Sequence, residues 1–164
     1  MAASSLDFFA LLSTLTAHKV DFIVIGGVCA VLHGAPVTTY DLDVVHSRDP
    51  ENLNRLLAAL RELDAVYREP LPRRIAPGIS HVASPGHQLL TTRFGPIDLL
   101  GTVNEGQGYE ELLPTTVELQ VEENLRVRLV DLETLIALKE EAGRDKDKMV
   151  LPVLRRTLEE KGKT

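Results

Sequence analysis

Two aspartates separated by one apolar residue are the part of this sequence best suited to chemistry. In Asp41-Leu42-Asp43-Val44, acidic and apolar residues alternate. Successive side chains of a strand point to opposite faces, so Asp41 and Asp43 are expected side by side, with Leu42 and Val44 in the core. Two adjacent carboxylates repel each other unless a cation lies between them. The pair therefore predicts a site for a hard divalent cation, and the alternative is a solvated strand end.

A third aspartate lies within an apolar stretch further along the chain. Ile97-Asp98-Leu99-Leu100 places one charge inside an otherwise apolar strand. An unpaired carboxylate is costly to bury, so we expect Asp98 to have a metal or a cationic partner. The alternative is a position on the solvent-facing side of an edge strand.

A pair of glycines precedes the acidic segment. Gly26-Gly27 follows the β-branched run Phe22–Ile25 and precedes a short predicted helix, Val28–His33. Glycine lets a phosphate approach the backbone at a helix N-terminus, and phosphate contact is our prediction here. A tight turn from strand to helix would give the same pattern.

Basic residues gather late in the chain. Lys139, Arg144 and Lys146 lie at the end of one predicted helix and the start of the next. They could bind substrate phosphates as charge-assisted donors, or they could simply complement the dipole at a helix C-terminus.

A proline-rich stretch, residues 68–86, is expected to be a long loop that either contacts a nucleic acid or nucleotide or is simply solvated. Its basic residues are Arg68, Arg73 and Arg74.

The glycine pair, a spacer of thirteen residues and the Asp41/Asp43 segment together resemble the signature of the nucleotidyltransferase (DNA polymerase β-like) superfamily. Asp98 resembles the third acid that this superfamily carries on a later strand. The resemblance is closer to bacterial AbiEii/AbiGii-type minimal nucleotidyltransferases, and it spans roughly residues 20 to 155. The residues that carry this closer resemblance are the Gly26–Gly34 stretch with its His33-Gly34 ending, Lys139, Ala142-Gly143-Arg144 and Lys146-Asp147.

This resemblance implies a mechanism and a set of partners. Asp41 and Asp43 would hold Mg²⁺, or Mn²⁺, on a nucleoside triphosphate, ATP among them, and Asp98 would help to bind a second ion and activate an acceptor hydroxyl. Gly26, Gly27, Lys139, Arg144 and Lys146 would contact the nucleotide. The acceptor could be RNA, a protein or a small molecule. The chain could also be the toxin of a two-gene system, with a cognate antitoxin as its partner.

Val37 departs from the superfamily pattern, because many relatives have an arginine four residues before the first metal aspartate. This departure favours a second interpretation, a nucleotide-binding or regulatory domain of the same fold without turnover. The three retained acids favour an active enzyme. A third interpretation is an unrelated α/β protein in which the motif occurs by chance.

Helical segments mixed with paired strands predict an α/β or α+β sandwich. The resemblance implies the nucleotidyltransferase fold, a mixed sheet flanked by helices with a short helical C-terminal extension. Residues 1–130 are expected to form the nucleotidyltransferase-like core, and residues 131–164 to form helices packed on or near it as one compact unit. Pro152 is expected to kink or interrupt the last helix. Predicted helices are 5–18, 28–33, 49–63, 131–142 and 146–160, and predicted strands are 22–25, 42–45, 88–94, 97–100, 116–121 and 125–130.

Composition sets the broad class. The 164 residues are 44% hydrophobic, enough for a core of ordinary size. A net charge of −6 argues against a protein that coats long nucleic acids. The single cysteine, Cys29, allows no intrachain disulfide. With no apolar stretch near the roughly 20 residues needed to span a bilayer, we expect a soluble, cytoplasmic protein with no membrane partner.

Overall fold

The computed structural model describes residues 5–68 and 74–163, so Arg73 lies outside the described residues. In them, one mixed sheet contains β1 (Phe22–Ile25), β2 (Leu42–His46), β3 (Val66–Tyr67), β4 (His87–Thr92), β5 (Gly95–Leu100), β6 (Thr116–Glu122) and β7 (Leu125–Val130). Its order is β3-β4-β5-β2-β1-β7-β6. β2 runs parallel to β5 and antiparallel to β1, and β1 runs parallel to β7. β4–β5 and β6–β7 are antiparallel pairs.

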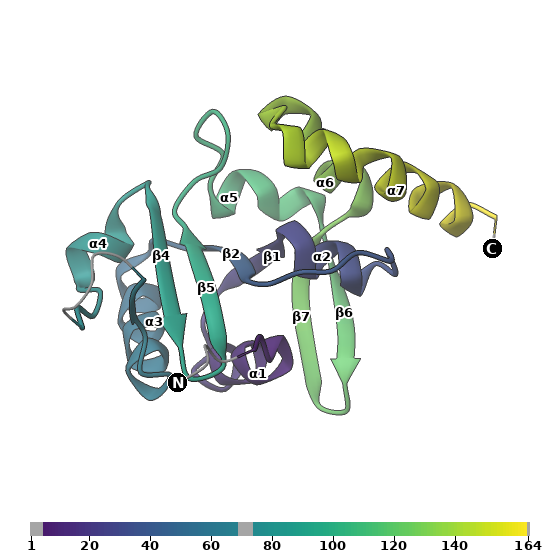
Figure 1. Cartoon of the computed structure of the whole chain (residues 1–164). Helices are drawn as coiled ribbons and strands as arrows, with labels where there is room; N and C mark the ends of the chain where they lie inside the picture. The colour runs from purple at the N-terminus through teal and green to yellow at the C-terminus, as the bar shows by residue number, and fades with distance from the viewer. Residues whose placement is uncertain (1–4, 69–73, 164) are drawn as a thin grey trace.

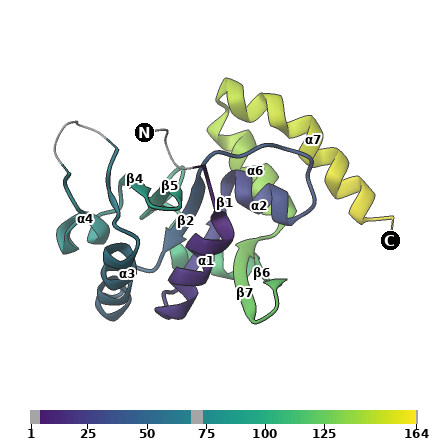
Figure 2. The ribbon, with the colours of Figure 1, turned by 60° about the horizontal axis from the view of Figure 1, so that its bottom comes forward.

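Helices flank this sheet in two groups (Figures 1 and 2). One group contains α1 (Phe8–Ala17), α3 (Pro50–Glu62) and α4 (Ile79–Ala83), and the other contains α2 (Gly26–Leu32), α6 (Leu132–Ala142) and α7 (Asp145–Lys161). The short α5 (Tyr109–Leu112) and the 3₁₀ turn η1 (Leu113–Thr115) connect β5 to β6. The predicted fold class, a mixed sheet flanked by helices, is confirmed.

Local signals in the sequence set the ends of the helices that matter for the site. Asp131 accepts a hydrogen bond from the Thr134 N–H at 2.7 Å and so caps the start of α6. Gly143 ends α6 in the left-handed conformation, with φ of 63°, which glycine adopts without strain. The chain then turns directly into α7, so α6 and α7 lie against each other (Figure 1).

Four features differ from the sequence-based expectation. α4 lies within the stretch expected to be a loop, and α5 and β3 were not predicted. These elements are only two to five residues long, too short for a hydrophobic period to emerge. α7 continues from Asp145 to Lys161 through Pro152, so the helix is not interrupted there, and the alternative of a kink stays a prediction. A division at residue 130 stays a prediction, since β7 ends there in the same sheet as β1.

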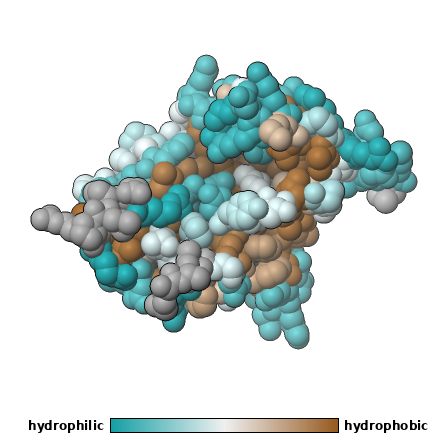
Figure 3. Space-filling model, in the orientation of Figure 1, coloured by the Kyte–Doolittle hydropathy of each residue, from teal (hydrophilic) through white to brown (hydrophobic). Residues whose placement is uncertain are grey.

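The core lies between the sheet and its helices. All four residues of β1 are buried, as are the alternate residues Leu42 and Val44 of β2. On the face shown in Figure 3, hydrophilic residues cover α6 and α7 and the tip of the β6–β7 hairpin, with an apolar area between them. No helix among the described residues combines the length and the apolar character that crossing a membrane requires.

Candidate active site

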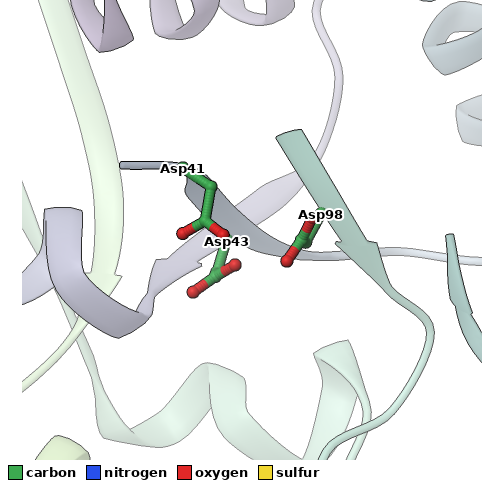
Figure 4. A group of neighbouring side chains, drawn as sticks. All are labelled: Asp41, Asp43 and Asp98. Atoms are coloured by element: carbon green, nitrogen blue, oxygen red, sulfur yellow. The ribbon is translucent and has the colours of Figure 1, made fainter. Parts of the chain in front are cut away.

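The three predicted aspartates lie together at neighbouring strands (Figure 4). Asp43 is the second residue of β2 and is the register partner of Asp98 on the parallel strand β5. Asp41 immediately precedes β2. One carboxylate oxygen from each of the three lies within 4.8 Å of the others. Because β5 is paired on both sides, by β4 and β2, Asp98 is not on an edge strand.

Crowding and burial make this group of carboxylates electrostatically unfavourable by itself. Burial, the charges of Asp41 and Asp98 and a hydrogen bond with Asp98 raise the pKa of Asp43 to about 8. Burial raises the pKa of Asp41 as well, and the charge of Asp98 adds to that rise. Without a metal ion, the raised pKa favours the protonated form of the Asp43 carboxyl. A divalent cation bound by the same oxygens would take the place of that proton, so the residues fit a metal site.

Both glycines make room for the acidic segment. A Cβ on Gly26 would lie 2.2 Å from Asp43 Oδ2, and the φ of Gly26 is +70°. A Cβ on Gly27 would lie 2.5 Å from Thr39 Oγ1, and that hydroxyl donates to the backbone carbonyl of Asp41 at 3.0 Å. The absence of a side chain at Gly26 and Gly27 thus lets the side chains of Asp43 and Thr39 pack closely against the backbone. Gly26 also lines the cavity in front of the aspartates.

A cavity of about 390 Å³ connects the aspartates with the late basic residues. Besides Asp41, Asp43 and Asp98, its walls include the predicted nucleotide contacts Lys139, Arg144 and Lys146. Lys139 projects from α6, and the other two lie at the start of α7. The fold thus places an acidic group and a basic group, far apart in the sequence, around one space. This arrangement suits a ligand that brings both a metal ion and phosphates.

Asp147 is a member of this site to which the sequence analysis gave no role. It is 1% exposed and pairs with Lys139 Nζ at 3.4 Å and with Arg144 Nε at 2.7 Å. It also accepts from the Arg144 N–H at 3.2 Å and so caps the start of α7. Burial alone would raise the pKa of Asp147, but the hydrogen bond from Arg144 and the charge of Lys139 lower it overall. One buried carboxylate therefore fixes two of the basic residues.

Arg68 is the second member that sequence reasoning missed, since it was grouped with a solvated or nucleic-acid-binding loop. Its guanidinium forms an ion pair with Asp98. Asp98 thus has the cationic partner that its position in an apolar strand required. The contact depends on the pairing of β3 with β4, which no local pattern in the sequence reveals.

Other residues singled out in the sequence have structural positions. His33 is buried, its Nε2 donates to the Val130 carbonyl at 2.8 Å, and its Nδ1 accepts from Lys161 Nζ at 2.8 Å. Cys29 is buried, and burial raises the pKa of its thiol to about 12. Val37 packs against the core, so this position brings no charge to the site.

Known structures share this architecture. The Thermotoga maritima protein TM1012, a candidate nucleotidyltransferase, superposes with a TM-score of 0.57 at 16% identity, covering 93% of this chain and 91% of that one. The lincosamide antibiotic adenylyltransferase LnuA, solved with lincomycin bound, gives a TM-score of 0.62 at 12% identity, covering 93% and 98%. The chain has the nucleotidyltransferase fold. No protein-family profile and no curated protein sequence matches it.

Proposed function

We propose that this chain is a Mg²⁺-dependent nucleotidyltransferase that transfers a nucleoside monophosphate from a nucleoside triphosphate to an acceptor hydroxyl. The observation that carries the proposal is the single cavity lined by the three aspartates and by Lys139 and Lys146. Carboxylate oxygens suit Mg²⁺, or Mn²⁺ in its place, and the basic side chains suit phosphates. Likeness of fold to LnuA supports the reaction class.

Different residues of the site would bind the metal, the acceptor proton and the triphosphate. Asp41 and Asp43 would hold the metal ion on the triphosphate. Asp98 would help to bind a second ion and would accept the proton of the acceptor hydroxyl. Lys139, Arg144 and Lys146 would bind the triphosphate. When bound, the metal would supply charge stabilisation for the attacking and leaving oxygens of an in-line displacement. The products would be a nucleotidylated acceptor and pyrophosphate.

Narrower assignments belong to the same proposal. The Gly26–Gly34 stretch and the Lys139–Asp147 stretch support placing the chain near the AbiEii/AbiGii-type enzymes. That placement would include a toxin role with a cognate antitoxin and an RNA or protein acceptor. LnuA acts on a lincosamide, which makes a small-molecule acceptor the competing choice. Because LnuA is an adenylyltransferase, ATP is the first nucleotide to test.

A labelling experiment tests the proposal. Wild-type protein is incubated with each α-labelled nucleoside triphosphate, Mg²⁺ and cell lysate, and the RNA, protein and small-molecule fractions are then counted separately. We expect Mg²⁺-dependent label in one fraction, with none for Asp43→Asn and a normal amount for Asp64→Asn, an exposed aspartate away from the cavity. Transfer by Asp43→Asn would refute the metal-ligand assignment. Nucleotide binding without pyrophosphate release in any fraction would favour the domain without turnover.

A further inference from the structure

Arg68 is fixed to the sheet at several points. Its backbone N–H donates to the Leu89 carbonyl at 3.2 Å, which extends the β3–β4 pairing by one residue. Its Nη1 donates to the Leu90 carbonyl at 3.0 Å. With Nη1 anchored in this way, Nη2 meets Asp98 Oδ1 on the next strand, β5. The guanidinium therefore spans β4 with its orientation set by the backbone of that strand.

This ion pair is more protected than the surface pairs of the protein. The side chains of Arg68 and Asp98 are 29% and 15% exposed, whereas those of Arg155 and Glu140 are both 52% exposed. Solvent screens a pair less when it is partly buried, and the planar guanidinium fork holds a carboxylate in a defined direction. A carboxylate has two oxygens. Arg68 can therefore hold Asp98 through one oxygen while the other stays available, together with Asp41 and Asp43, to bind a metal ion.

We propose that Arg68 is a positioning residue of the metal site, acting through Asp98. It pairs with one oxygen of Asp98 and thereby orients this carboxylate. The carboxylate of Asp98 lies beside those of Asp41 and Asp43 (Figure 4). The inference rests on the proposed metal site. The proposal also gives the metal site a basic residue, Arg68, although the position where many relatives have an arginine is occupied by Val37.

Charge and geometry predict opposite effects when Arg68 is removed. Arg68 is a cation near a cation-binding site, so by charge alone its loss would tighten metal binding. If Arg68 orients Asp98, its loss leaves a ligand free to turn away, and metal binding weakens. Outer residues that orient metal ligands typically contribute about 10- to 100-fold in metal affinity. The sign of the change in affinity therefore separates the two roles.

The test measures Mn²⁺ binding by the full chain, by calorimetry and by electron paramagnetic resonance, without an acceptor. We expect Arg68→Gln to bind Mn²⁺ about 10-fold or more weakly than the wild type. Arg68→Lys is expected to be weakened as well, because it keeps the charge but loses the fork. Arg128→Gln is the matched control, since Arg128 is 34% exposed, pairs with Glu118 at 3.0 Å and does not line the cavity. Added guanidinium should restore part of the affinity of Arg68→Ala.

Each result of these Mn²⁺-binding measurements either supports or contradicts the positioning role of Arg68. Unchanged or tighter Mn²⁺ binding by Arg68→Gln overturns the positioning role while leaving the metal site in place. If Arg68→Gln does not fold, as judged by circular dichroism, Arg68→Lys decides by the same criterion. Wild-type protein that binds no Mn²⁺ contradicts the proposed metal site itself. A loss of affinity that guanidinium does not restore, in a variant of lowered thermal stability, assigns Arg68 to folding alone and also overturns the proposal.

Discussion

Asp43 of β2 and Asp98 of β5 are register partners in a parallel pair of strands. Partners of this kind leave the sheet on the same face, so two carboxylates from different parts of the sequence meet by topology alone. Asp41 joins them from the residue that precedes β2. The cost of this proximity, and its relief by a bound cation, lead to the first two predictions.

In the absence of metal, Asp43→Asn should stabilise the protein at high pH. The pKa of Asp43 rises from 3.8 to about 8 on folding, so between these values the folded state binds more protons than the unfolded state. Its contribution to stability therefore falls as pH rises through this window, and asparagine removes that loss. We expect Asp43→Asn to gain at least about 1 kcal/mol at pH 9 relative to pH 4. Urea unfolding in EDTA measures this, and a variant equally destabilised at both pH values would contradict it.

Mg²⁺ should stabilise the wild-type protein and should bind more tightly as pH rises toward 8, because it competes with the proton on Asp43. At roughly 100 times its Kd the ion would add about 2.7 kcal/mol to the free energy of unfolding. Thermal unfolding with and without Mg²⁺ at several pH values gives the measurement. Asp43→Asn should lose the response and Asp64→Asn should keep it. Equal Mg²⁺ responses in these two variants would exclude the triad as the binding site.

Gly26→Ala should weaken metal binding, whereas Gly34→Ala should not. Both glycines have positive φ, +70° and +96°, so each substitution costs about 1 kcal/mol of stability through backbone strain. Only at position 26 would the new Cβ meet Asp43 Oδ2, at 2.2 Å, while nothing lies within 4 Å of a Cβ at position 34. Calorimetric titration with Mn²⁺ compares them. Equal affinities would mean that the carboxylate of Asp43 can move aside.

Asp147→Asn should lower both stability and nucleotide affinity. The carboxylate of Asp147 is buried and pairs with Lys139 and Arg144, so its neutralisation leaves two cations without their counter-charge. A loss of roughly 2–3 kcal/mol is expected by urea unfolding, with weaker binding of a non-hydrolysable triphosphate by calorimetry. Asp145→Asn, an exposed position in the same first turn of α7, serves as the control. Unaltered nucleotide affinity in Asp147→Asn would show that the pairing serves the fold alone.

Local patterns in the sequence account for most of the elements and for the acidic half of the site. The alternation around Asp41 and Asp43 predicts a shared face, and an isolated charge in an apolar run marks Asp98 as a residue that needs a partner. An α/β or α+β arrangement follows from the same periodicities, whereas the mixed sheet was implied by the family resemblance. Roles for the individual site residues, including Lys139, remain predictions that await the experiments above.

Other parts of the site depend on long-range packing and could not be predicted. The partner of Asp98 is Arg68, thirty residues earlier, and the contact exists only because β3 pairs with β4. The burial of Asp147 depends on which face of α7 turns toward α6, and a helix with charges on several faces does not reveal this. The close approach of Gly26 to Asp43 and of Gly27 to Thr39 is also not evident from the sequence, and contact of these glycines with a phosphate stays a prediction.

The seventeen residues of α7 form a rod about 25 Å long, and besides its buried middle residues Leu151 and Leu154 it makes a polar contact near each end. Near its start, Asp147 pairs with Lys139 beside the cavity. Near its end, Lys161 donates to His33 of the segment that follows α2. A substitution at His33 would remove the contact at the far end of this rod, whose other end carries Asp147 beside the cavity. The helix that carries Arg144, Lys146 and Asp147 into the cavity wall is therefore also anchored by a residue, His33, that does not line the cavity.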